Sequence, residues 1–123
     1  MVDELTTRMT DGERLWVWRK FRTGLSRPQL MEQLNFGRSR VSEMENDRYP
    51  VWIRLEDGAV VPLRIRMTAA SLKLPERLAL ARRRSGLSLR EVARLYGVSH
   101  VTLLKLERAG SVDLLNWWKS KKK

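Results

Sequence analysis

The chain has 123 residues, is 42% hydrophobic and carries a formal net charge of +11 at pH 7. Cysteine is absent, which excludes disulfides, thiolate metal sites and thiol nucleophiles, and no metal site or Ser-His-Asp triad can be built around the single histidine alone. No apolar run approaches the ~18 residues of a membrane span, and the acidic first residues are unlike a signal peptide. We therefore expect a soluble cytoplasmic protein without metal or cofactor.

The positive charge is concentrated in the last third of the chain. Residues 76–123 contain twelve Lys or Arg against four Asp or Glu, whereas residues 1–49 contain nine against eight. A basic surplus of this kind predicts a polyanionic partner, and nucleic acid is the commonest one. The tail Lys121-Lys122-Lys123 would add non-specific attraction to phosphate.

Two stretches of the chain repeat each other. Gly24-Leu25-Ser26 recurs as Gly86-Leu87-Ser88, 62 positions later, and this offset continues without gaps. Before these stretches the offset is 63, as between Arg19 and Arg82. One residue inserted in a turn at Arg22-Thr23 explains the change of offset. The repeat predicts a duplicated module of about 35–40 residues, because two copies are too few for a solenoid.

The first copy predicts three helices in succession. The first helix ends at the Gly24 breaker and places large apolar side chains on one face, namely Leu15, Trp18 and Phe21. Ser26 is placed to cap a second helix, with Gln29 three residues on. After a short turn, a third helix packs Val41 and Met44.

In residues 51–65, between the two copies, the polar and apolar residues alternate with a period of two instead of the helical period. Polar and apolar residues alternate from Trp52, and Asp57-Gly58 is a hairpin turn signal. Pro62 restricts its strand to a sheet edge or ends it. We expect a β-hairpin followed by a short connector, so that residues 51–74 link the two modules.

The second copy repeats the helical pattern with clearer caps. Pro75 opens its first helix, and Ser88 with Glu91 forms a capping box for the second. Ser99 is a favourable N-cap for the third helix. Ser111 is placed to cap a further helix, whose apolar residues are Leu114, Leu115, Trp117 and Trp118.

Each copy resembles the Cro/CI-type (Xre-like) helix-turn-helix domain of phage and bacterial regulators. In the second copy the matching residues are Gly86-Leu87-Ser88, Glu91-Val92-Ala93, Tyr96-Gly97-Val98-Ser99, Leu103 and Leu106-Glu107. In the first they are Gly24-Leu25-Ser26, Leu30, Leu34, Val41 and Met44-Glu45-Asn46; this copy departs from the family at Asn35-Phe36-Gly37.

The resemblance implies a mainly α fold, with two tandem lambda-repressor-like domains at residues 1–50 and 75–123 joined by the hairpin-containing linker at 51–74. It also implies two buried ion pairs with a structural role, Arg19 with Glu45 and Arg82 with Glu107.

The family places its third helix in the DNA major groove, with the first turn nearest the bases. The expected base contacts are Arg38, Ser39, Arg40 and Glu43 in the first copy, and His100, Val101, Thr102 and Lys105 in the second. Arginine reads guanine through paired bonds, Glu43 can accept from cytosine or repel phosphate, and Val101 or the Thr102 methyl can pack on a thymine methyl. The alternative for Arg38 and Arg40 is that they are ordinary solvated charges on the protein surface.

Other residues are expected at the DNA backbone or at a protein interface. The expected phosphate contacts are Arg27, Asn46, Arg48, Arg83, Arg84, Arg90 and Arg108. Leu104 has no polar group for the groove, so it meets either thymine or protein, and we favour protein. Trp52 is a further candidate for a protein interface.

Together these features predict a transcription regulator that binds double-stranded DNA sequence-specifically, of the phage or plasmid (auto)repressor type. We expect a homodimer, with a single-chain pseudo-dimer as the alternative. The rival function is a protein-binding adaptor or inhibitor of host machinery. RNA is a less favoured partner, because the major groove of RNA is too narrow for this motif. The sequence has no recognisable catalytic motif, so we do not expect an enzyme.

Overall fold

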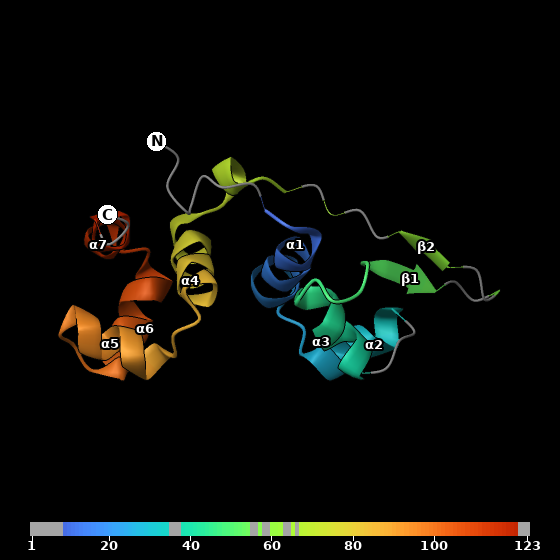
Figure 1. Cartoon of the computed structure of the whole chain (residues 1–123), viewed down its shortest axis with the longest axis horizontal. Helices are drawn as coiled ribbons and strands as arrows, with labels where there is room; N and C mark the ends of the chain where they lie inside the picture. The colour runs from blue at the N-terminus through green and yellow to red at the C-terminus, as the bar shows by residue number, and fades with distance from the viewer. Residues whose placement is uncertain are drawn as a thin grey trace. The chain divides into compact units, whose positions relative to one another are not determined.

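The computed structural model describes residues 9–34, 38–54, 57, 60–62, 65 and 67–120. These residues are mainly helical and divide into two compact units, Met9–Met67 and Thr68–Lys123 (Figure 1). The boundary falls inside the segment 51–74 that the sequence sets apart as a linker. It falls there because Val51 and Ile65 pack against the core of the first unit.

The first unit begins with α1 (Asp11–Val17), which continues directly as the π-helix η1 (Trp18–Thr23). The helices α2 (Arg27–Leu34) and α3 (Arg38–Glu45) follow. α1 packs against α3, and α2 also packs against α3. The three predicted helices of the first copy are therefore confirmed, except that the second half of the first one is a π-helix.

Side chains cap the first turns of α1 and α2. The Thr10 hydroxyl accepts from the Glu13 N–H, and the Glu13 carboxylate accepts from the Thr10 N–H at 2.9 Å. The predicted Ser26–Gln29 pair forms the same reciprocal contact, with the Ser26 N–H donating to Gln29 Oε1 at 2.8 Å. These bonds satisfy backbone donors that a helix start leaves without a partner.

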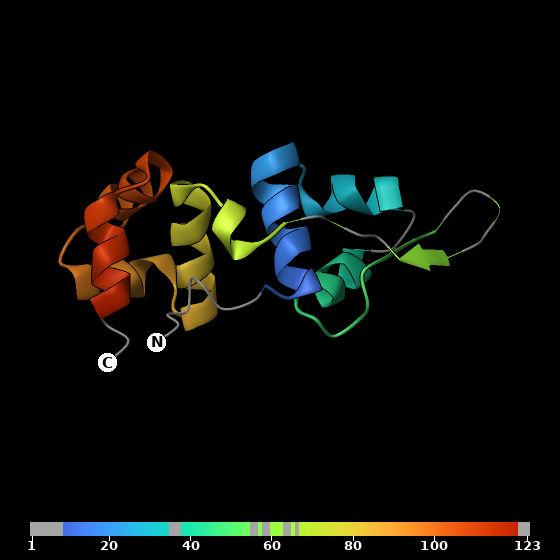
Figure 2. The same cartoon turned by 90° about the horizontal axis from the view of Figure 1, so that it is seen from above.

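The residue inserted in the first copy lies within a helix, which corrects the predicted turn at Arg22-Thr23. Gly24 ends η1 in the left-handed conformation and donates its N–H to the Arg19 carbonyl, five residues back. Its counterpart Gly86 donates to the Arg83 carbonyl, only three residues back. A π-turn accommodates one extra residue without breaking the helix, so α1 and η1 form one continuous helix (Figure 2).

The core of the first unit takes side chains from all of its α-helices. Its buried members are Leu15, Leu30, Val41, Met44 and Val51. Trp18 packs against them as predicted, but Phe21 is 36% exposed and instead sets its ring edge-on against Trp16. The prediction for Phe21 was wrong because the wider turn of η1 takes the residues after Trp18 out of the 3.6-residue period.

The first unit also contains a pair of short strands, β1 (Trp52–Arg54) and β2 (Val60–Pro62). They are antiparallel, with Trp52 opposite Pro62. Both lie within residues 51–65, where the alternating pattern predicts strands. β2 ends at Pro62, since proline has no N–H to donate to a ladder. Asp57 lies in a turn, whereas Gly58 lies outside the described residues.

The second unit repeats the helical order of the first and adds a helix. Its elements are the short 3₁₀ helix η2 (Ala69–Ser71), α4 (Leu74–Ser85), α5 (Leu89–Tyr96), α6 (His100–Ala109) and α7 (Val112–Ser120). The predicted caps form: the hydroxyls of Ser88, Ser99 and Ser111 accept the N–H groups of Glu91, Thr102 and Leu114. Ordinary α-helix runs to the end of α4, because this copy lacks the inserted residue.

α7 closes the core of the second unit. The buried side chains are Leu78, Ala81, Val92, Ala93, Leu103, Leu114, Leu115 and Trp118. Trp117 adds an edge-on contact to Tyr96, with 5.2 Å between ring centroids. From α5, Tyr96 packs against this core, whereas its neighbour Leu95 is 53% exposed.

Candidate nucleic-acid interface

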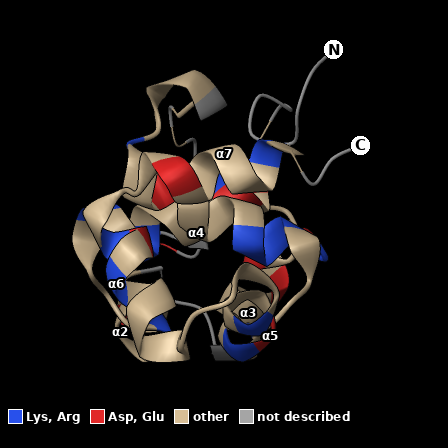
Figure 3. Cartoon of the chain, turned by 90° about the vertical axis from the view of Figure 1, so that its left-hand side faces the viewer, with Lys and Arg blue, Asp and Glu red and all other residues tan. Residues whose placement is uncertain are grey.

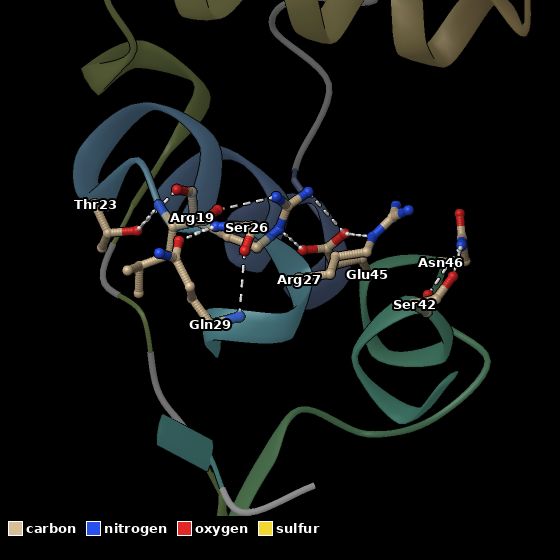
Figure 4. Close-up of polar contacts among 9 residues, drawn as sticks. Arg19, Thr23, Ser26, Arg27, Gln29, Ser42, Glu45 and Asn46 are labelled. Atoms are coloured by element: carbon tan, nitrogen blue, oxygen red, sulfur yellow. Dashed lines mark hydrogen bonds and ion pairs between the residues drawn. The ribbon is translucent and has the colours of Figure 1, made fainter. Parts of the chain in front are cut away.

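A buried carboxylate anchors the last turn of α3 (Figure 4). Glu45 is fully buried and accepts from two arginines. Arg19 donates from Nε and from Nη2, the latter to Glu45 Oε1 at 3.2 Å. Arg27, the first residue of α2, donates from Nε to the same oxygen at 3.1 Å. Two cations offset the cost of removing the carboxylate from water, and they tie α3 to the two helices before it.

The second unit has a simpler version of this anchor. Arg82 donates from Nε to Glu107 Oε2 at 2.9 Å and from Nη2 to Oε1 at 3.3 Å. Leu89 stands where the first unit has Arg27, and it packs against the hydrophobic core. Both ion pairs implied by the resemblance are therefore confirmed. Each one fixes how the third helix of its unit lies against the first.

The described residues of α3 leave its outer face accessible. Ser39 is exposed, and Arg40 and Glu43 are half-exposed with 4.0 Å between Arg40 Nη1 and Glu43 Oε2. The Arg40 guanidinium lies over the Tyr49 ring, with Cζ 3.7 Å from the ring centroid. Arg38 is the first residue of α3, but the structure does not describe its side chain.

The first turn of α6 is held by its cap. Ser99 Oγ accepts from the Thr102 N–H at 3.1 Å and donates to Thr102 Oγ1 at 2.9 Å. Thr102 and Lys105 are exposed, Val101 is 50% exposed, and His100 is half-buried. The start of α6 thus presents two apolar groups, the Val101 side chain and the Thr102 methyl, beside polar ones.

The outer stripes of α3 and α6 differ in charge. The first stripe consists of Ser39 and Glu43 on α3 and Asn46 directly after it. At the same repeat positions the second unit has Val101, Lys105 and Arg108, all on α6. The first stripe carries one negative charge and the second carries two positive charges. Basic residues also lie on α4 and α5, namely Arg82, Arg83 and Arg84 on α4 and Arg90 and Arg94 on α5; Lys and Arg are blue in Figure 3. The positive charge of the two stripes therefore lies on the second unit, while the first stripe offers hydrogen-bonding groups and one carboxylate.

The predicted phosphate contacts have different surroundings. Arg48, Arg90 and Arg108 are exposed, whereas Arg83 and Arg84 are half-buried. Asn46 donates its side-chain amide to the Ser42 carbonyl at 2.9 Å (Figure 4). Arg27 is committed to Glu45 through Nε, although its side chain remains 40% exposed. The sequence did not predict this link, because Leu89, which is the repeat counterpart of Arg27, carries no charge to pair with a glutamate.

The two residues predicted for a protein interface are each half-buried. Trp52 lies at the start of β1, and Leu104 lies on α6 between the outer stripe and the core. Val101 is the more exposed apolar residue of this helix. An apolar contact through α6 would therefore be centred on Val101, with Leu104 at its margin.

Sequence reasoning missed two residues that shape this surface. Tyr49 lies under Arg40. Asp47 has a positive φ of 59° and accepts from the Gly12 N–H and the Thr10 hydroxyl at the start of α1. The only sequence signal for either residue is that it lies within four residues after the end of α3. Asp47 and Tyr49 also line a small pocket whose other residues are Asp11, Arg48, Pro50 and Val51.

The described residues include no group of three or more His, Cys, Asp or Glu side chains that could hold a metal ion. Among the same residues, no helix has the length and apolar character needed to cross a membrane. Comparison with protein-family models, with curated proteins and with solved structures finds no match for this chain.

Proposed function

We propose that the chain is a transcription regulator that binds double-stranded DNA sequence-specifically. In this proposal α2–α3 and α5–α6 are two helix-turn-helix modules, and α3 and α6 enter the major groove. The supporting observation is that both units hold their third helix by the same arginine–glutamate link and leave its outer stripe accessible. The net charge of +11 suits a phosphate backbone.

The two modules have different roles in this proposal. The second module carries the exposed Arg90 and Arg108 and supplies affinity for phosphate. The α3 stripe carries hydrogen-bonding groups, with Arg40 beside it, and supplies most of the base discrimination. A single chain that acts as a pseudo-dimer with two unlike reading helices prefers an asymmetric site with half-sites about 34 Å apart. A homodimer, which we favour, reads an inverted repeat instead. Action as a phage- or plasmid-type repressor rests on the family resemblance alone.

Selection from a random duplex library tests the proposal. The wild-type chain is expected to enrich a defined motif. Replacing Arg38 and Arg40 by alanine is expected to change one part of that motif, and replacing His100 and Lys105 another part. Enrichment of no motif by the wild type would contradict sequence-specific regulation.

Salt dependence separates the proposal from its rival, a protein-binding adaptor or inhibitor. The 50% exposure of Val101 at the start of α6 favours the rival, since an accessible apolar residue suits a protein contact. A chain making about six phosphate contacts loses roughly five orders of magnitude in DNA affinity per tenfold rise in salt. The double variant Arg90→Ala/Arg108→Ala, at two exposed expected phosphate contacts, should lower this slope by about two, with Asn116→Ala on the exposed side of α7 as the uncharged control.

A further inference from the structure

The side chain of Arg40, in the first unit, is already held in place by the protein itself. The Cζ atom of Arg40 lies 3.7 Å from the centroid of the Tyr49 ring. At this distance the guanidinium lies on the face of the ring, because an atom that approached the ring edge would be farther from the centroid. Cation–π attraction and stacking between flat groups both favour this arrangement.

Tyr49 is itself fixed by the protein core. Its half-buried side chain packs against the cluster that contains Val41, Met44 and Val51. Arg40 therefore rests on a ring that cannot readily move. Glu43 lies 4.0 Å from Arg40 Nη1 and is 43% exposed, so its attraction is weakened by water and is the smaller influence.

Stacking uses the face of the guanidinium and leaves its N–H edge off the ring, where only the weak contact of Nη1 to the 43% exposed Glu43 has to be exchanged for a partner. A free arginine loses much rotamer entropy when it is ordered by a partner, and an arginine already ordered loses less. A planar donor edge fits the O6 and N7 acceptors that guanine presents in the major groove. The pair thus has the form of a preorganised guanine reader.

The second unit lacks both members of this pair. At the repeat offset of 62, Thr102 stands in place of Arg40 and Ser111 in place of Tyr49. Thr102 contacts Ser99 instead, and Ser111 caps α7. The arginine and its aromatic support are present together in one copy and absent together from the other, as expected of residues that act jointly.

We propose that Tyr49 is a positioning residue that holds Arg40 for the recognition of one guanine in the DNA site. The inference rests on the proposed function, since it needs a duplex that the chain prefers. It adds that the guanine is read by the first unit only, and that reading depends on a residue outside the third helix.

The test uses the full chain and the duplex selected by it, with affinity measured by fluorescence anisotropy. We assign to Arg40 the guanine whose replacement by adenine lowers the affinity of the wild type but not that of Arg40→Ala. For the wild type this replacement is expected to lower affinity by about 5- to 150-fold. Tyr49→Leu removes the ring but keeps an apolar side chain, and Tyr49→Phe is the matched control that keeps the ring.

Tyr49→Leu is expected to weaken binding to the guanine duplex by about 2- to 30-fold. It should leave binding to the adenine duplex unchanged, and Tyr49→Phe should behave like the wild type. In the Arg40→Ala background, Tyr49→Leu should have no further effect. If Tyr49→Leu does not fold, Tyr49→Met provides the same comparison.

Equal weakening of both duplexes by Tyr49→Leu overturns the inference and leaves DNA recognition intact. Unchanged discrimination between guanine and adenine overturns it as well. If the wild-type chain prefers no duplex, the proposed function and the inference both fail, and that outcome is seen before any variant is made.

Discussion

The Gly12 N–H donates to Asp47 Oδ1 across 2.9 Å, so the turn after α3 caps the first turn of α1. Asp47 is in the left-handed conformation, and its other carboxylate oxygen accepts from the Thr10 hydroxyl at 2.6 Å. A carboxylate at a helix start satisfies backbone donors there and is favoured by the helix dipole. The two ends of the three-helix segment are thereby joined.

Gly12→Ala is expected to destabilise the first unit by about 1–3 kcal/mol. A Cβ at this position would lie 2.6 Å from the Met44 carbonyl oxygen and 2.7 Å from the Glu45 carbonyl oxygen, and backbone atoms cannot give way cheaply. Urea unfolding followed through amide NMR signals of the first unit measures the loss. Asp11→Ala, which removes a 77% exposed carboxylate and its ion pair with Arg14, is the neighbouring control and is expected to cost less than about 1 kcal/mol. An equally stable Gly12→Ala protein would contradict so close an approach of α1 and α3.

Glu45→Ala is expected to cost more stability than Glu107→Ala. Loss of Glu45 leaves Arg19 and Arg27 without their shared carboxylate, whereas loss of Glu107 affects only Arg82. Breaking a buried ion pair costs about 3–5 kcal/mol, and the partial exposure of Arg27 makes its own share small. Denaturant unfolding of the two variants gives the comparison. A larger loss for Glu107→Ala would refute the ranking.

Deletion of Lys20 is expected to convert η1 into ordinary α-helix and to leave the first unit folded. The shortened helix then has the length found in the second copy, which keeps its Arg82–Glu107 pair with Gly86 four residues after Arg82. We expect stability within about 1 kcal/mol of the wild type. Backbone chemical shifts report the helix type. Loss of the folded signals of α2 and α3 would show that the π-turn is essential to the unit.

The capping box at the start of α5 predicts a small pH effect. The Ser88 backbone N–H holds the pKa of Glu91 below its usual range, with smaller contributions from the Ser88 hydroxyl and Arg94. The folded-state pKa is thus the lower one, so the contribution to stability is present above the unfolded-state pKa. It is lost as the pH falls through the folded-state pKa. Glu91→Gln should remove this part of the pH dependence, and carboxyl NMR titration of the wild type should give the lowered pKa.

The apolar start of α6 predicts sensitivity to thymine methyl groups if α6 reads DNA. Replacing thymine by uracil in the selected duplex removes only the methyl that Val101 and Thr102 can contact. We expect the affinity for the duplex to fall about fourfold for each contacted methyl that is removed, because burying a methyl-sized group contributes roughly 0.8 kcal/mol. Thr102→Ser keeps the hydroxyl that is bonded to Ser99 but removes the methyl. This variant should therefore bind thymine and uracil equally at one position of the duplex. Indifference of the wild type to uracil everywhere would instead favour a protein partner for this surface.

The sequence by itself determined the features that depend on short spacings. The repeat, the helices of both copies and the caps at Ser26, Ser88, Ser99 and Ser111 follow from it, because a helix and its cap are set by residues three or four positions apart. The Arg19–Glu45 and Arg82–Glu107 pairs were also foreseen, through the repeat and the resemblance it supports.

Only the tertiary structure decided how distant residues meet. The sequence gives an extra residue in the first copy but does not say that a π-turn absorbs it and turns Phe21 out of the core. Nor does it say that Arg27 joins Glu45, or that Tyr49 supports Arg40. Periodicity tells which face of a helix is apolar, whereas a contact between charged or aromatic side chains depends on how helices and the turns after them pack together.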